Sequence, residues 1–529
     1  MRRLLSHIDH LSPLYVSTIL FFITVIVYAN TLSNGLFYDD EHFIYNNIYV
    51  TSFSFFNFFT ESTTSGGGGG VSNYYRPLLT FLFSVQYFLF GNSGFIFHLV
   101  SLLLQAGCGI LIYTIFKKIF NSSIPAFLTA ILFIVHPIQT EAISYASGQG
   151  DPLSLFFLLL SITYVLKKKT KTALMLLGGS LLSKETGLLA PGFISLVLVV
   201  QEKNISFSTI KSVLLKSLPF WIASFSYFFL RLTILNFSNT LNFYNANNPY
   251  TESIFVRLNT FFHILPTYAL LLVKPFPLFI DRNVSIYTTI DPTVIIVILI
   301  LGIAVSASIY YFKKLPILFF SIGWTALGFI PTSGIIPING IMYEHFLYYP
   351  SIGIFTLVSF GIYYLLTNRS LIAIPIFIIL SSGLFYFSIL TIQRNSDWHD
   401  PIRFYNQTLT YTESARIRNN LAIAYAESGD TKNAIIQYKK SVQISDTYPQ
   451  THLNLGNSYL ALEAYTSAEQ EYLKSIQLDP TFDRPYISLI NLYKKTDQTE
   501  KIKNILKLAE DVAKKNKNFI PFLEYLRTQ

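Results

Sequence analysis

The sequence predicts an all-α protein in which a polytopic helical membrane domain is followed by a C-terminal α-solenoid. Two observations support this fold class. Hydrophobic residues make up 51% of the 529-residue chain and charged residues only 13%, whereas a soluble domain has roughly 25% charged residues. From residue 415 onward the composition becomes polar and repeats with the period of about 34 residues that is typical of helical-hairpin repeats.

About eleven apolar runs of the chain predict membrane-spanning helices, because a span needs about 20 mostly apolar residues. The runs 172–182 and 188–200 are short, so they form either a tight hairpin or one broken span. The candidate spans are approximately 13–33, 94–116, 124–138, 152–166, 172–182, 188–200, 211–231, 292–311, 315–331, 349–366 and 370–391.

Basic residues between these runs indicate the orientation of the chain. They alternate consistently onto one side, which the positive-inside rule identifies as the cytoplasm. An odd number of spans then predicts a cytoplasmic N-terminus and extracytoplasmic repeats. Segments 78–90 and 254–273 begin and end outside, so interfacial or re-entrant helices are expected there. The basic clusters are Arg2/Arg3, Lys117/Lys118, Lys167/Lys168/Lys169/Lys171, Lys203/Lys211, Lys313/Lys314 and Arg369.

Charge and cysteine content exclude several other classes of protein. The net charge is +9, but the basic residues lie in short clusters between apolar runs, so no nucleic-acid partner is expected. The single cysteine, Cys108, lies inside an apolar segment. One cysteine allows neither a disulfide framework nor a cysteine-based metal site.

The polar tail carries the tetratricopeptide pattern, in which small residues let paired helices approach and aromatic residues fill the space between them. Equivalent positions of the first two copies hold Leu421 and Leu455, and Tyr438 and Tyr472. Such a solenoid presents a concave surface to an extended polypeptide. The predicted boundaries are 1–392 for the membrane domain, 393–414 for a linker and 415–529 for the solenoid, with repeats 415–448, 449–482 and 483–516 and a cap at 517–529.

Asp39 and Asp40 follow the first predicted span, at the outer rim of the membrane. A carboxylate at this place can remove a proton from a hydroxyl group or hold a divalent cation beside a phosphate. Arg76 lies in the same outer loop and carries the planar guanidinium suited to phosphate. The alternative is a pair of solvated acids that cap a helix end.

Further ionisable residues lie at the outer ends of other spans. His136 and Glu141 share one turn with Asp151, and Lys184 and Glu185 lie between two short apolar runs. An ionisable residue near membrane depth is a functional candidate. The alternatives are a solvated turn and a lysine–glutamate pair that neutralises itself. His136 and Glu141 lack the spacing of a zinc protease.

The segment before the span at 349–366 contains Glu344 and His345. These residues could complete an anionic-lipid site, although a histidine among aromatic residues is also often a packed structural one. Trp398 follows the last span and is expected in the interfacial aromatic belt.

Taken in order along the chain, these stretches resemble the transmembrane and tetratricopeptide-repeat O-mannosyltransferases, members of the GT-C glycosyltransferase superfamily, and indicate a prokaryotic relative. The resemblance implies transfer of a hexose, mannose in the best-known members, from a polyprenyl-phosphate donor to a Ser or Thr hydroxyl on the extracytoplasmic face. The repeats would hold the acceptor polypeptide. The matching stretches are NGLFYDDEHFIYNN, YYRPLLTF, FHLVSLLLQAG, LFIVHPIQTEAISYASGQGDPLSLFFLLLS, LLSKETG, YEHFLYYPSIG and RNSDWHD.

The resemblance also implies roles for single residues. Asp39 and Asp40 would be catalytic and could hold a divalent cation, and no other cofactor is expected. The residues expected to bind the donor phosphate are Arg76, Lys184 and His345. The residues expected to line the cavity and meet the acceptor are His136, Glu141, Glu185 and Glu344. The chain departs from the family at His345, where members often have an arginine, and histidine is only partly charged at neutral pH.

Three alternatives remain open at this point. The same fold could glycosylate a lipid or an envelope glycan, or the chain could be a non-catalytic membrane scaffold that uses its repeats for assembly. The third alternative is a transporter, which would need broken helices in matching halves of the chain, and the sequence does not show them. The expected location is a membrane crossed several times. The bias toward Ile, Asn, Lys, Phe and Tyr favours a prokaryotic plasma membrane over the endoplasmic reticulum.

Overall fold

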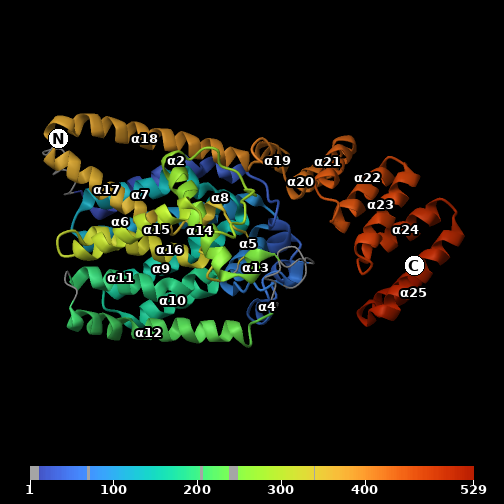
Figure 1. Ribbon diagram of the computed structural model, residues 1–529, viewed down its shortest axis with the longest axis horizontal. Helices are drawn as coiled ribbons and strands as arrows, with labels where there is room; N and C mark the ends of the chain where they lie inside the picture. Colours follow the sequence, from blue (N-terminus) through green and yellow to red (C-terminus); the bar gives the residue numbers. More distant parts are fainter. Residues whose placement is uncertain are drawn as a thin grey trace. The chain divides into compact units, whose positions relative to one another are not determined.

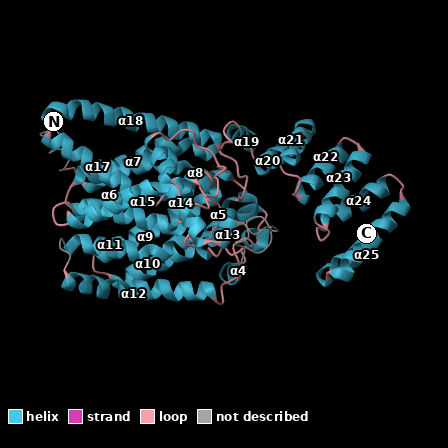
Figure 2. Ribbon diagram, viewed as in Figure 1, coloured by secondary structure: helices cyan, strands magenta, loops and turns pink. Residues whose placement is uncertain are grey.

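The computed structural model describes residues 11–67, 72–202, 206–237, 248–336, 338 and 340–528. Helices and the loops between them make up this part of the chain, and no strand occurs among these residues (Figure 2). The chain divides into two compact units, Met1–His399 and Asp400–Gln529. The predicted all-α fold class is therefore confirmed, and the boundary between the units falls inside the segment expected to be a linker.

The first half of the membrane unit runs from α2 to α12 (Figure 1). Its elements are α2 (Pro13–Tyr28), η1 (Ala29–Ser33), η2 (Glu41–Tyr45), α3 (Ile48–Thr51), α4 (Phe55–Thr60), η3 (Ser65–Gly67), α5 (Pro77–Phe90), α6 (Gly94–Phe120), α7 (Ser123–Val135), η4 (Pro137–Gln139), α8 (Thr140–Ser144), η5 (Ala146–Gln149), α9 (Gly150–Leu166), α10 (Thr170–Ser183), η6 (Glu185–Leu189), α11 (Ala190–Glu202) and α12 (Phe207–Leu232).

The second half of this unit runs from α13 to α18. Its elements are α13 (Pro249–Glu252), α14 (Ile254–Val273), α15 (Pro292–Tyr310), α16 (Pro316–Phe329), η7 (Ile330–Thr332), η8 (Glu344–Leu347), α17 (Pro350–Asn368) and α18 (Ser370–Asp397). The basic residues Arg2, Arg3 and Lys203, used above for orientation, lie outside the described residues.

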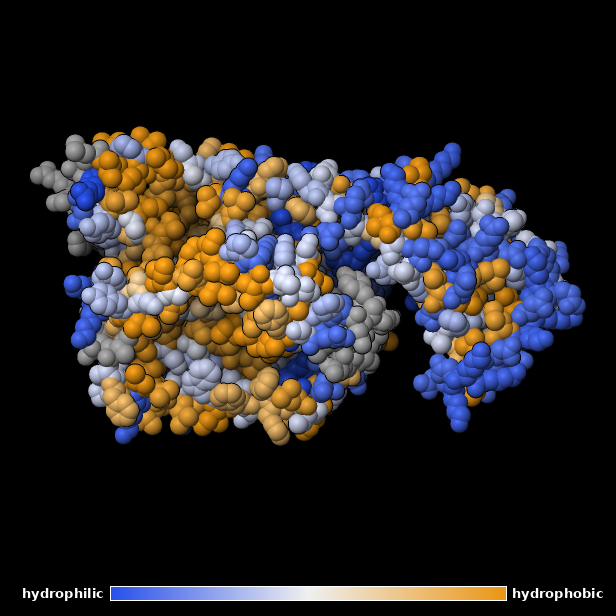
Figure 3. Space-filling view, viewed as in Figure 1, coloured by the Kyte–Doolittle hydropathy of each residue, from blue (hydrophilic) through white to orange (hydrophobic). Residues whose placement is uncertain are grey.

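Nine helices in the described part of the chain are long and apolar enough to cross a membrane, and α7 with α8 forms a tenth candidate that is bent by 55° at His136. Two predicted spans, 172–182 and 315–331, correspond to the shorter helices α10 (14 residues) and α16 (14 residues). Helix α14 (20 residues) is long enough to cross, although the sequence predicted an interfacial or re-entrant helix there. The apolar surface of the unit covers α15 and α18 in Figure 3.

Glycines let neighbouring spans approach closely, as is common in membrane helix pairs. A Cβ atom on Gly109 would lie 2.6 Å from Ile134 Cδ1, so α6 and α7 pack through this glycine. A Cβ atom on Gly328 would lie 2.8 Å from Pro350 N, which brings α16 against α17 in the same way. Trp324 fills the adjoining interior and donates its indole N–H to Tyr349 O at 3.1 Å.

The second unit is a solenoid of paired helices. Each of the first two hairpins is closed by a serine at the same repeat position, because Ser441 Oγ donates to Ala415 O and Ser475 Oγ to Pro449 O, both at 2.7 Å. The segment expected to be a linker contains α19. The helices are α19 (Pro401–Leu409), α20 (Ala415–Glu427), α21 (Thr431–Ile444), α22 (Pro449–Ala461), α23 (Tyr465–Leu478), α24 (Arg484–Lys495), α25 (Thr499–Lys515), η9 (Lys517–Phe519) and α26 (Ile520–Thr528).

Candidate active site

The loop after α2 presents the two acids differently. It is anchored to α18, since Asn34 Nδ2 donates to Asn395 O at 3.2 Å. Tyr38 then adopts a φ of +66°, which is uncommon for a residue with a side chain and marks a locally constrained backbone. Beyond this turn Asp39 is exposed, whereas Asp40 is only 2% exposed. Adjacent carboxylates thus face different surroundings.

Asp40 accepts three hydrogen bonds inside the protein. Its Oδ1 accepts from Ser147 N at 2.8 Å and from Ser147 Oγ at 2.5 Å, and its Oδ2 accepts from Phe37 N at 3.2 Å. Burial raises the pKa of Asp40 from 3.8 to about 7, although the bonds from Ser147 oppose that rise. Three donors suit the ionised, acceptor-only carboxylate. The structure therefore makes Asp40 an anchor for the loop that carries Asp39.

Asp39 lies beside a pair of stacked aromatic side chains. Its backbone N–H donates to Tyr145 Oη at 3.2 Å. The Tyr145 ring stacks on Trp398, with centroids 5.2 Å apart and planes inclined by 22°. Trp398 is 1% exposed, so the expected position in an interfacial belt is wrong. This tryptophan instead supports the tyrosine that contacts Asp39.

The two acids do not by themselves form a cation site. Among the described residues, no group of three or more His, Cys, Asp or Glu side chains is arranged to hold a metal ion. Both oxygens of Asp40 already accept hydrogen bonds, which leaves Asp39 as the one exposed carboxylate of the pair. The donor set therefore does not fit a metal held by protein ligands, and no chemical step is assigned to a cation.

In addition to the Asp39–Asp40 pair, which is the first cluster, Arg76 and Lys184 form a second cluster in which each cation has an acidic partner. Arg76 Nε and Nη2 donate to Glu185 Oε2 at 3.1 and 2.9 Å, and Lys184 Nζ donates to Asp151 Oδ2 at 2.6 Å. Burial alone would lower the pKa of Arg76, but the Glu185 carboxylate outweighs it and the pKa lies above its ordinary value. Arg76 therefore remains charged beside its carboxylate partner.

Lys184 and Glu185 do not neutralise each other, although they are adjacent in sequence. Lys184 has an extended backbone, with φ −158° and ψ 152°, between the end of α10 and the start of η6. Extended residues direct successive side chains to opposite sides. The two side chains consequently reach different partners, and the self-neutralising alternative for this pair is wrong.

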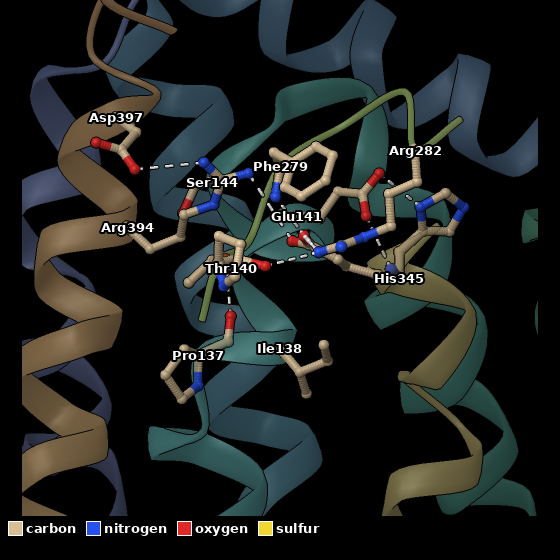
Figure 4. Close-up of polar contacts among 12 residues, drawn as sticks. Pro137, Ile138, Thr140, Glu141, Ser144, Phe279, Arg282, His345, Arg394 and Asp397 are labelled. Atoms are coloured by element: carbon tan, nitrogen blue, oxygen red, sulfur yellow. Dashed lines mark hydrogen bonds and ion pairs between the residues drawn. The ribbon is translucent and has the colours of Figure 1, made fainter. Parts of the chain in front are cut away.

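A third cluster joins Glu141 and Glu344 to three basic residues. Figure 4 labels Glu141 and the three basic residues, His345, Arg282 and Arg394. Glu141 Oε1 lies 3.0 Å from His345 Nδ1, and Glu141 Oε2 accepts from His345 N at 2.9 Å. Glu344, 1% exposed, accepts from Arg282 Nη2 at 3.0 Å, and Arg394 Nη2 lies 3.8 Å from its other oxygen. His345, expected to bind the donor phosphate, therefore contacts an acid of the predicted cavity.

Arg282 and Arg394 were not among the site residues predicted from the sequence. Arg394 lies near the end of α18, is 4% exposed and also pairs with Asp397 at 3.3 Å. A charge at the end of an apolar span was a usable signal for Arg394. Arg282 belongs to an irregular segment after α14, where no periodicity points to a buried partner.

His136 stands apart from these clusters. Its Nδ1 accepts from Ile138 N at 3.2 Å, and its Nε2 lies 3.1 Å from Leu272 O. The ring packs against Phe355 and Phe387, at centroid distances of 5.2 and 4.7 Å. Because both ring nitrogens contact backbone groups, the imidazole caps η4 at the bend after α7 and does not meet the acids expected beside it.

Comparison with known proteins agrees with this organisation. Residues 422–463 match a family described as TPR repeat, and residues 449–482 match the tetratricopeptide repeat. The chain is 25% identical over 457 residues to the protein O-mannosyl-transferase F38B6.6 of Caenorhabditis elegans, covering 82% of this chain and 63% of the relative. It is 25% identical over 443 residues to the human protein O-mannosyl-transferase TMTC3, covering 75% and 47%, respectively. Its homologues are protein O-mannosyl-transferases.

The chain also matches Drosophila melanogaster protein O-mannosyl-transferase Tmtc3, with 24% identity over 534 residues that cover 84% of this chain and 57% of the relative. It thus spans between about half and two thirds of the length of these relatives. The resemblance recognised from the motifs is confirmed by the names of the homologues and by the repeats.

One short segment of this O-mannosyl-transferase homologue contacts all three clusters. Residues 137–151 contribute Glu141 to the third cluster, Ser147 to the Asp40 anchor and Asp151 to the second cluster. Its compactness depends on Gly148, where a Cβ atom would lie 2.9 Å from Glu141 O. The bend after α7 and the tight turn at Gly148 therefore bring polar groups from distant parts of the chain together around this segment.

Proposed function

We propose that this chain is a membrane-embedded glycosyltransferase. It transfers a hexose, mannose in the first instance, from a polyprenyl-phosphate donor to a Ser or Thr hydroxyl of a polypeptide on the extracytoplasmic side. The observation that carries the proposal is the exposed Asp39 beside the buried, triply bonded Asp40, at the exit of the first span. The homologues, all named protein O-mannosyl-transferases, support the sugar and the protein acceptor.

The proposed topology places the N-terminus in the cytoplasm and the repeats outside. Helix α14 contacts one loop through both of its halves, because Arg257 Nε donates to Gly334 O at 2.7 Å and Tyr268 Oη to Tyr343 O at 3.2 Å. These contacts support a helix that stays on the outer side. We count α7 and α8 together as one span, count α10 and α16 as one span each, and leave α14 out. The number of spans is then odd, as the side on which the basic clusters lie requires. The residue composition supports a prokaryotic plasma membrane.

In the proposed reaction the acceptor hydroxyl oxygen attacks the anomeric carbon of the donor. The bond from that carbon to the phosphate oxygen breaks, and polyprenyl phosphate leaves with the electron pair. The hydroxyl proton passes to the Asp39 carboxylate, which is the exposed member of the pair and can meet a water-borne acceptor. Asp40 acts through its bonds to Ser147 and Phe37, which hold the backbone of Asp39, and so it is a positioning residue.

Arg76 and Lys184 can stabilise the departing phosphate without leaving their acidic partners. A guanidinium has five N–H donors and an ammonium has three. The bonds to Glu185 and Asp151 use only part of these sets, so further donors can turn toward an anion. Fixed donors in a partly desolvated site stabilise developing negative charge efficiently. The paired acids then serve to orient both cations.

Sugar transfer in membranes tests the proposal. The membranes carry the native chain, Asp39→Asn or the matched control Glu61→Gln, which changes another acid of the same loop. Radiolabelled polyprenyl-phosphate hexoses, mannose first, are the donors. We expect label in protein with the native chain and the control, and a loss of about 100-fold or more for Asp39→Asn, because a positioned base contributes about 10²- to 10⁴-fold.

Two other results would overturn the proposal. Label that appears in lipid or glycan and not in protein would assign a different acceptor to the same fold. Equal background for the native chain and Asp39→Asn with every donor, while the chain is folded, would favour the non-catalytic scaffold.

A further inference from the structure

A phenylalanine-rich surface projects from the first outer loop. Phe56 on α4 is 81% exposed, and Phe88 near the end of α5 is 74% exposed. We call the exposed apolar residues of these two helices and of the turn before α4 the phenylalanine surface: Phe53, Phe55, Phe56, Phe59, Phe88, Leu89 and Phe90.

The two helices present one continuous surface. The ring of Phe53 lies 5.8 Å from that of Phe88 and 6.1 Å from that of Phe81, and the ring of Phe55 lies 6.2 Å from that of Phe81. No charged residue occurs between positions 43 and 60 or between positions 77 and 97. An apolar patch of this kind, free of charge over both stretches, marks an interaction surface.

The surface continues into the lipid-facing part of the molecule. Helix α5 has 14 residues and a length of about 21 Å, which is too short for the hydrocarbon core of about 30 Å. It leads directly into α6, a candidate span, whose Phe95 is 49% and Leu103 47% exposed. The apolar exposure of α5 therefore runs on, without a charged residue, onto a helix that faces lipid.

The opposite side of α5 supports the candidate active site. Leu79 and Phe83 are fully buried against Ile44, which follows Asp40 in the loop, and against Ala146, which precedes Ser147. In Figure 1, α5 lies at the same end of the membrane unit as α8. A single helix thus has an exposed apolar face and a buried face against the segments that hold the acids.

We propose that α4 and the end of α5 insert the phenylalanine surface into the lipid leaflet beside Asp39. The occupant is the bilayer itself, because the surface is continuous with a span and because α5 is apolar yet too short to cross. This contact fixes the depth of the loop that carries Asp39 and Asp40 relative to the lipid surface. The inference concerns membrane binding and holds whether or not the chain transfers sugar.

A depth measurement with single spin labels tests the inference. Cys108, the one cysteine of the chain, is buried and is replaced by alanine. Nitroxide labels are then attached to Phe56→Cys and, in a second variant, to Phe88→Cys, in the full chain in phosphatidylcholine nanodiscs. Ile300→Cys, at the middle of α15 and 59% exposed, is the lipid reference, and Gln443→Cys on exposed α21 is the aqueous reference.

We expect both test labels to collide with oxygen more readily than with a water-soluble nickel chelate, at a depth between the two references. Collision with nickel as frequent as at Gln443 would overturn the inference, because the surface would then lie in water. Shielding from both reagents would also overturn it and would indicate a protein partner, such as a second copy of the chain. Label mobility at the Ile300 reference shows that the chain is folded.

Discussion

Removing the hydroxyl of Ser147 should move the pH dependence of transfer. Ser147 Oγ donates to Asp40 Oδ1 at 2.5 Å, and a hydrogen bond to a buried charged group contributes about 1.5–3 kcal/mol. Because the alanine variant loses that support for the ionised carboxylate, the pKa of Asp40, about 7 in the native chain, rises by about 1–2 units at about 1.4 kcal/mol per unit.

Ser147→Ala should therefore lose transfer activity by a factor that depends on pH. If the ionised Asp40 holds the loop for transfer, a pKa of about 7 leaves half of the native chain active at pH 7. The rise by about 1–2 units reduces that fraction roughly 5- to 50-fold at pH 7, and at least about half of the activity returns by about pH 9. The assay is the initial rate of label transfer into protein between about pH 5.5 and 9.5.

Ser144→Ala is the matched control, because Ser144 Oγ bonds the neutral Asn395 side chain at 2.7 Å on the same segment. It should lower stability without moving the pH inflection. A Ser147→Ala rate that falls by one factor at every pH, or an inflection that stays at its native position, would refute the assigned role of Asp40.

Three further predictions concern other contacts. Arg76→Lys loses the bidentate contact with Glu185, so the rate of sugar transfer should fall about 10- to 100-fold. Thermal unfolding should not change. An unchanged transfer rate would count against a donor-phosphate role for Arg76. Gly456→Ala places a Cβ atom 2.6 Å from Tyr472 Cε1, which should cost about 1–3 kcal/mol and increase hydrogen exchange in α22 and α23; native exchange would contradict this packing. Burial lowers the pKa of His452, but hydrogen bonds to two carboxylates outweigh burial and leave the pKa above 6.5. The charged His452 therefore stabilises the fold fully below pH 6.5, and this stabilisation is lost as the pH rises through the raised pKa. Hydrogen-exchange protection of α22, measured against pH in the native chain and in His452→Gln, checks this sign: protection in the native chain should fall as the pH rises, whereas the variant should show no such fall.

Hydropathy located the spans because a bilayer imposes a minimum apolar length, and α6 and α15 follow that rule closely. It did not distinguish α10 and α16, whose 14 residues fall below that length. The 34-residue period located the paired helices of the solenoid because each repeat must bury the same face. Local patterns of this kind are visible in a single sequence.

The pairings within the candidate site were not visible in the sequence. Arg76 and Glu185 are 109 residues apart along the chain, and nothing local links them. Which of the two adjacent acids is exposed depends on the positive φ of Tyr38, and a tyrosine gives no sign of such a backbone. The sequence predicted that the acids, the arginine and the turn at 136–151 lie on one side of the membrane, but it could not show the partner of each charge, which depends on the tertiary fold.

Asp151 and Ser147 lie four residues apart, about one helical turn, and each carries a contact of a different cluster. In the proposed reaction the donor phosphate shares the Lys184 ammonium with Asp151, and the backbone from Asp151 to Ser147 links this site to a donor of Asp40. Coupling between two equilibria is reciprocal. Any change in phosphate affinity on protonation of Asp40 must therefore equal, as a factor, the change in the proton affinity of Asp40 on phosphate binding. Under the proposed function, donor occupancy and the protonation state of Asp40, which positions Asp39, are thus linked through the five residues from Ser147 to Asp151.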